Sequence, residues 1–211
     1  MGGAPAAVAG TGSGGLRTAT IVLFWCTAGA SVLAVIAFFS RRSAWVDFTE
    51  GSGSASTVDD ADDLVSAALG LTFLLALASS ILVPLWSLRV ARRARSAGAT
   101  DVSPGLACGS WYIPYASAIV PFVPLRRTAR RWQRPTGLLN VWQACYIALW
   151  VTGTAVMGFE PTDEDAVRAF FDPTEITDKL TAQAVFGVLS LVALFVMAFA
   201  AMQAMRTIDD T

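Results

Sequence analysis

The sequence predicts an all-α integral membrane protein with four transmembrane helices. Of its 211 residues, 55 % are hydrophobic and only 15 % are charged, and the mean hydropathy is +0.56. These values are far from those of soluble domains. Four segments of 23 to 26 residues contain no Asp, Glu, Lys or Arg, and each is long enough to cross about 30 Å of hydrocarbon. The remaining charges are segregated by sign along the chain.

The four predicted spans divide the chain into a simple order. They are residues 18–40, 64–88, 137–159 and 180–205. Residues 1–17 are rich in Gly and Ala without apolar periodicity, so we expect a disordered cytoplasmic tail. Residues 18–205 then form a single membrane domain, with outer loops at 41–63 and 160–179, a cytoplasmic linker at 89–136 and a short cytoplasmic tail at 206–211.

A cleavable signal peptide is the alternative interpretation of the first span. Its apolar stretch is longer than the roughly 7–15 residues of a signal-peptide core, and no A-x-A site precedes Arg41. We therefore interpret it as a membrane helix. Within the other spans, Pro84 predicts a kink, and small residues such as Ala184 and Gly187 allow close approach between helices.

The charge distribution predicts the orientation. The two segments 41–63 and 160–179 hold thirteen acidic and four basic residues, whereas the rest of the chain holds eleven arginines and three acids. Short basic loops stay in the cytoplasm. Both termini and the linker 89–136 are therefore expected inside. Arg41 and Arg42 argue the other way but are outnumbered.

The apolar segment 103–124 is expected to be broken rather than to span the membrane. It contains prolines at positions 104, 114, 121 and 124. Each proline removes a backbone donor and restricts the preceding residue, so a continuous helix would leave carbonyls unpaired in lipid. A crossing would also divide the arginines between two compartments. We expect a re-entrant or interfacial segment, with its aromatic residues at headgroup depth.

Residues 125–134 predict a short amphipathic helix lying on the inner leaflet. At 100° per residue, five arginines fall on one arc of roughly 140°, opposite Leu125, Thr128, Ala129 and Trp132. The candidate residues for binding anionic lipid headgroups are Arg126, Arg127, Arg130, Arg131, Trp132 and Arg134. Fixing the topology is the alternative role of these arginines. Nucleic acid is not expected as a partner of so short a patch at a membrane.

The stretch SPGLACGSWYIPYASAIVPF, followed by LRRTARRW, resembles a family of small four-span bacterial membrane proteins found mainly in high-GC Gram-positive bacteria and classified as a domain of unknown function. The matching residues are Ser103, Pro104, Gly105, Gly109, Trp111, Tyr112, Ile113, Pro114, Ala116, Pro121, Arg126 and Arg130. The chain departs from the family pattern at Ser117 and Val120, where relatives have Asn and Arg, and at Ala129, where a Trp is frequent. The resemblance implies the bacterial cytoplasmic membrane and no particular activity.

The sequence offers no catalytic constellation. It has no histidine, and no carboxylate lies inside a span, so neither a nucleophile with a base nor an intramembrane proton relay is expected. The acidic runs at 59–63 and 163–166 lack calcium-loop spacing. Cys26, Cys108 and Cys145 lack metal-site spacing. We expect no enzyme activity, no cofactor and no metal site.

Two functional hypotheses remain. The first is a non-catalytic scaffold or accessory subunit that acts through a membrane protein partner or anionic lipid in the bilayer. The second is a small-molecule or lipid transporter with its site at the broken segment 103–124, because discontinuous helices form such sites. In both, the candidate partner- or ligand-binding residues are Trp111, Tyr112, Pro114, Tyr115, Ser117 and Pro121.

Overall fold

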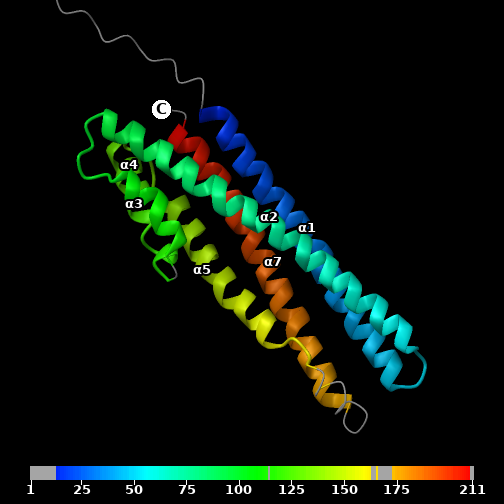
Figure 1. The fold of residues 1–211 in the computed structure, drawn as a ribbon. Helices are drawn as coiled ribbons and strands as arrows, with labels where there is room; N and C mark the ends of the chain where they lie inside the picture. The colour runs from blue at the N-terminus through cyan, green and yellow to red at the C-terminus, as the bar shows by residue number, and fades with distance from the viewer. Residues whose placement is uncertain (1–12, 114, 163–164, 166–172, 210–211) are drawn as a thin grey trace, which may run out of the picture.

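The predicted fold class is confirmed by a computed structural model of the chain, which describes residues 13–113, 115–162, 165 and 173–209. The described part is all-α, with six α-helices and two 3-10 turns (Figure 1). Its four long helices are α1 (Ser13–Thr49), α2 (Ala55–Ser96), α5 (Gly137–Gly158) and α7 (Pro173–Asp209). All four are long and apolar enough to cross a membrane. The protein is therefore a multi-pass membrane protein.

The first hairpin is more helical than the sequence predicted. Most of the expected loop 41–63 belongs to α1 and α2, which leaves only a turn at residues 50–54. Charged residues end a stretch that can sit in hydrocarbon, but they do not end a helix. Buried Ala44, Val58 and Ala61 keep the two arms packed together beyond the apolar spans, and α1 reaches about 55 Å at 1.5 Å per residue.

The other predicted boundaries shift for the same reason. Residues 13–17 and 206–209, predicted as parts of the two tails, are helical and continue α1 and α7. The remainder of the predicted tail 1–17 and residues 210–211 lie outside the described residues. The start of α7 at Pro173 likewise takes residues from the expected loop 160–179.

The long helices pack in the order α2, α1, α7, α5. Helix α1 contacts α2 and α7, and α5 packs against α7. Within the described residues, α2 and α5 are not packed along each other. At one end this opening is bridged by α3 (Pro104–Gly109), α4 (Phe122–Arg131) and the segment between them, which contact both α2 and α5 (Figure 1).

The predicted break in segment 103–124 is confirmed. Ser103 caps α3, and the chain then passes through the 3-10 turns η1 (Ser110–Tyr112) and η2 (Ala116–Ala118). Tyr115 has a φ of 62°, a left-handed conformation that is uncommon for a residue other than glycine. The segment therefore turns repeatedly instead of forming one helix. Whether it re-enters the bilayer stays a prediction.

Helix α4 confirms the predicted amphipathic faces with shifted ends. Leu125, Thr128 and Ala129 are at most 1 % exposed. The helix starts at Phe122 rather than at residue 125, because Pro124 falls in the first turn, where a missing N–H leaves no bond unmade. It ends at Arg131 rather than at residue 134, and Gln133, with a φ of 55°, reverses the chain.

Charges of opposite sign gather at opposite ends of the bundle. The start of α1 and the ends of α2 and α7 lie beside α3 and α4, whereas the acidic α1–α2 turn lies at the far end (Figure 1). We refer to these as the basic end and the acidic end. The side of the membrane that each end faces stays a prediction.

Candidate functional site

A cavity of about 390 Å³ lies between α2 and α5, toward the basic end. Its lining residues come from four long helices and the broken segment: Phe24, Thr27, Ala76, Ser79, Ser80, Val83, Pro84, Trp111, Trp142, Tyr146, Leu149, Trp150, Leu194 and Met197. The inner wall is buried, whereas Ala76, Ser80 and Trp150 are exposed at the rim. Since these three lie on apolar spans, the mouth opens sideways, toward lipid.

Aromatic rings form the end of the cavity nearest to the broken segment. The Trp111 ring lies 6.3 Å from that of Trp142 and 5.8 Å from that of Tyr146, centroid to centroid. Phe122, at the start of α4, lies 5.6 Å from Trp142 and 5.5 Å from Trp111. These spacings are those of favourable aromatic pairs. The broken segment and α4 are thus held on the bundle through the same rings that line the cavity.

The serine and threonine hydroxyls in the cavity wall are already bonded. Thr27 donates to Leu23 O at 2.8 Å and Ser79 donates to Leu75 O at 3.0 Å, each within its own helix. Ser80 donates to Leu77 O at 2.7 Å. Trp111 Nε1 is buried without a hydrogen-bond partner, but the rest of the wall is largely apolar and offers little to an ion or a sugar, so the cavity suits an apolar chain.

The structure separates the six predicted ligand-binding residues. Trp111 alone among those described lines the cavity. Ser117 and Pro121 are buried within the broken segment, and Tyr112 and Tyr115 are 59 % and 88 % exposed on its outer side. Pro114 lies outside the described residues.

The predicted lipid-binding arginines have different surroundings. Arg127 donates to Asp101 O at 2.7 Å and Arg131 to Ala97 O at 3.5 Å, so both link α4 to the residues that follow α2 while remaining exposed. Arg130 is exposed. Arg134 is half-buried and follows α4. Trp132 is half-buried, with the Arg93 guanidinium 5.9 Å from its ring centre.

Arg126 points toward α5 rather than away from the protein. Its Nε donates to Asn140 Oδ1 at 2.8 Å, and its Nη2 bonds Gln143 Oε1. Gln143 Nε2 donates in turn to Ala118 O at 2.8 Å. These bonds join α4, α5 and the broken segment beside the aromatic end of the cavity.

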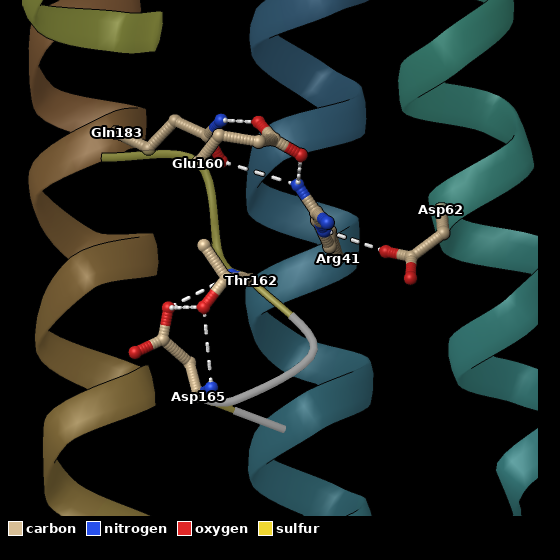
Figure 2. Close-up of polar contacts among 6 residues, drawn as sticks. All are labelled: Arg41, Asp62, Glu160, Thr162, Asp165 and Gln183. Carbon is tan, nitrogen blue, oxygen red and sulfur yellow. Dashed lines mark hydrogen bonds and ion pairs between the residues drawn. The ribbon is translucent and has the colours of Figure 1, made fainter. Parts of the chain in front are cut away.

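The acidic end holds a polar network around a buried arginine, shown in Figure 2. Arg41 is 7 % exposed, and its Nη1 lies 2.8 Å from Glu160 Oε1. Its Nε lies 2.5 Å from Asp62 Oδ1, an ion pair whose geometry is not that of a hydrogen bond. Gln183, which is fully buried, donates to Glu160 Oε2 and accepts from Arg41 at 3.5 Å. The Arg41 guanidinium thus connects α1 with α2, with α7 and with Glu160, which follows α5.

Asp165 forms a second contact of this end. Its carboxylate accepts from Lys179 Nζ at 2.5 Å and from the N–H and hydroxyl of Thr162 at 2.7 and 2.9 Å (Figure 2 shows the Thr162 bonds). The Lys179 bond, followed by the two from Thr162, lowers the pKa of Asp165 to about 2. The side chain is ionised at neutral pH and joins α7 to the segment after α5.

The basic end holds the converse arrangement, a buried acid among arginines. The Asp209 side chain is 3 % exposed, accepts from Trp86 Nε1 at 3.1 Å and pairs with Arg93. A carboxylate at the last position of α7 faces the negative end of the helix dipole, and the arginine offsets this.

Sequence reasoning missed most of the cavity and the contacts of the buried charges Arg41, Asp165 and Asp209. Apolar residues that line a cavity have the same chemistry as those that face lipid. One pattern could have indicated the site. Trp142, Tyr146 and Trp150 recur every fourth residue on α5, which places three aromatic rings that carry an N–H or O–H group on one face of the helix. In the described residues, no group of three His, Cys, Asp or Glu side chains is placed to hold a metal.

The chain was compared with protein families, curated proteins and solved structures. No curated protein and no solved structure matches it. A family model described as Domain of unknown function (DUF4328) matches residues 49–210, from the end of α1 to the end of α7. This match includes the broken segment, α4 and three of the four long helices. The protein therefore belongs to the DUF4328 family.

Proposed function

We propose that this protein is a non-catalytic membrane protein that acts by binding a lipid, whose apolar chain occupies the cavity between α2 and α5. The observation that carries this proposal is the sideways opening of an aromatic-lined cavity with internally bonded hydroxyls. A chain entering from the bilayer crosses no water and meets a wall that is mostly apolar. The absence of histidine from the sequence supports a role without catalysis.

The proposed setting is a bacterial cytoplasmic membrane, with the basic end and both termini inside. The gathering of arginines at one end of the bundle supports this orientation. The broken segment would then lie at the inner interface, where exposed Tyr112 and Tyr115 suit headgroup depth. Single cysteines replacing Ser54 and Ser96, in a background without native cysteines, test it. An impermeant thiol reagent should label them from opposite sides, and labelling from one side would contradict the orientation.

The cavity is tested by filling it. Ala76→Phe places a ring at the rim, and Ala67→Phe places the same ring on an exposed position of α2 outside the cavity. We expect native mass spectrometry of the purified protein to show one lipid fewer on Ala76→Phe than on wild type or Ala67→Phe. Equal lipid retention by all three would contradict the proposal.

A transporter is the second candidate, favoured by Pro84. This proline lies inside α2 and lines the cavity, and it removes the bond that its N–H would make to the Ser80 carbonyl. Such a position can bend and widen the mouth. A transporter predicts accelerated movement of a fluorescent phospholipid between vesicle leaflets, slowed by Pro84→Ala. Lipid retention without such movement favours the binding role.

The accessory-subunit hypothesis adds a protein partner at the exposed side of the broken segment. Tyr112, Ile113, Tyr115 and Ile119 are each more than half exposed there. Purification from native membranes tests this: a stoichiometric protein retained by wild type and lost on Tyr115→Ser would establish a partner. Lipid alone in the purified material supports the role proposed above.

A further inference from the structure

We infer that the cavity selects an anionic glycerophospholipid, with the acyl chain between α2 and α5 and the phosphate at Arg126. This inference rests on the proposed lipid-binding function and names the chemistry of its ligand. It gives Arg126 a role that differs from that of the other arginines of α4, which are exposed on the protein surface.

Within the part of the chain that the structure describes, no acidic side chain neutralises the charge of Arg126. Its two bonded partners, Asn140 and Gln143, are neutral amides. Among the described residues, no carboxylate forms an ion pair with it. The amides fix the direction of the guanidinium without cancelling its charge, and three further N–H donors of an arginine remain for an anion. By contrast, the buried charges described above, Arg41, Asp165 and Asp209, each have an oppositely charged partner.

Two connections place this guanidinium beside the cavity. Along α4, Arg126 follows Phe122 by one turn, and Phe122 packs on Trp111 and Trp142 of the cavity wall. Along α5, its partner Gln143 precedes the lining residue Tyr146 by three residues and Trp150 by seven. Gln143 and Trp150 thus share one side of α5 and lie about 10 Å apart along its axis.

This separation matches the build of a phospholipid. The headgroup layer extends roughly 5–8 Å beyond the hydrocarbon on each side of a bilayer. A phosphate at Arg126 therefore leaves the acyl chain at the depth of Tyr146 and Trp150. Arg127 and Arg130, exposed on the same helix, repel the cationic group of a zwitterionic lipid, so the site favours net negative headgroups.

The test compares two lipids that differ only in the headgroup. The protein is purified in mild detergent with equimolar dioleoyl phosphatidylglycerol and dioleoyl phosphatidylcholine, and native mass spectrometry gives the ratio of the two retained lipids. We expect wild type to favour phosphatidylglycerol, and Arg126→Gln to lower the ratio about fivefold or more. Arg130→Gln, with the same change of charge, should lower it less than about twofold.

A second variant guards against loss of structure. Asn140→Asp keeps the acceptor for Arg126 Nε, supplies the missing negative charge and places an acid near the start of α5, where the helix dipole favours it. The fold should be retained and the preference for phosphatidylglycerol lost, as with Arg126→Gln. An unchanged ratio in Asn140→Asp overturns the inference, as does an equal loss in Arg126→Gln and Arg130→Gln, which indicates a diffuse surface field.

Failure of this inference is distinguishable from failure of the proposed function. The total amount of retained lipid reports on the cavity, through Ala76→Phe. The ratio of phosphatidylglycerol to phosphatidylcholine reports on Arg126. Retention that depends on Ala76 but shows no headgroup preference overturns the phosphate site alone.

Discussion

The two ends of the bundle use opposite charges in the same way. At the acidic end, the buried minority charge is Arg41, surrounded by Asp62 and Glu160. At the basic end, it is Asp209, paired with Arg93 and Trp86. Each minority charge joins helices far apart in sequence, while the majority charges remain largely exposed. A charged residue whose sign is opposite to that of its end of the bundle thus stabilises helix packing, and it does not contradict the orientation predicted from the charge distribution.

The halves next to these ends pack differently. Toward the acidic end, small residues such as Ala34, Ala68 and Ala184 bring helices together, and the Gly187 position faces the Phe38 ring. Toward the basic end, large aromatic rings pack against one another, and the cavity remains open between the helices. The aromatic half therefore provides both rigidity and space.

Removal of Arg41 is expected to have the largest effect on stability. Arg41→Met leaves two carboxylates without their cation. Breaking a fully buried pair costs about 3–5 kcal/mol, and the expected loss is about 2–4 kcal/mol because Asp62 and Glu160 are 39 % and 44 % exposed. Thermal and denaturant unfolding in detergent measure it.

Its neighbour provides the control. Arg42 donates to Thr181 Oγ1 at 2.8 Å at an exposed site, so Arg42→Gln should cost less than about 1 kcal/mol. Similar losses for both arginines would show that the burial of Arg41 has no energetic importance.

Gly187→Ala tests the tight half of the bundle. A Cβ at this position would lie 2.8 Å from Phe38 Cδ2, closer than van der Waals contact, so we expect a loss of about 1–3 kcal/mol from overpacking. Gly153→Ala on α5 meets no atom within 4 Å and should instead gain up to about 1 kcal/mol of helix propensity. Equal melting temperatures of the two variants would contradict the packing.

Asp209→Asn tests the basic end. The amide keeps an acceptor for Trp86 but loses the charge that pairs with Arg93, whose side chain is 37 % exposed. We expect a loss of about 1–2 kcal/mol in denaturant unfolding. Asp101→Asn, at an exposed position of the same end, should change stability by less than about 0.5 kcal/mol.

The smallest effect concerns pH at the acidic end. Because Lys179 and Thr162 lower the pKa of Asp165 from 3.8 to about 2, the folded state binds this proton less readily than the unfolded chain. The contribution of Asp165 to stability is therefore complete above about pH 4 and is lost as the pH falls toward 2. Melting temperatures between pH 5 and 2.5 should decline less steeply in Asp165→Asn than in wild type. Equal slopes for wild type and Asp165→Asn would show that Asp165 does not contribute to the pH dependence of stability.

The sequence predicted the features that depend on local chemistry. Runs without charge identified the four spans, and prolines identified the broken segment. The spacing of Arg127, Arg130 and Arg131 identified the exposed face of α4. Three of the long helices were predicted too short, because charged residues limit the part of a helix that can lie in lipid but do not limit helix formation.

Features that depend on distant pairs were not predictable from one sequence. Arg41 and Glu160 are separated by 119 positions and Trp86 and Asp209 by 123, and no local pattern connects them. For the same reason Arg126 was grouped with the surface arginines, although it bonds Asn140 and Gln143 on α5. The cavity depends on α2 and α5 standing apart, which only the packing order reveals.

The length of α5 makes the protein sensitive to bilayer thickness. Its 22 residues extend about 33 Å, close to the hydrocarbon thickness of about 30 Å, whereas α1, α2 and α7 are long enough to accommodate thicker bilayers. In a thicker membrane, hydrophobic mismatch therefore affects α5 before the other long helices. The contacts near its two ends, Arg126 with Gln143 and Arg41 with Glu160, are then strained. We expect melting temperatures in vesicles of increasing acyl length to pass through a maximum where the bilayer fits α5.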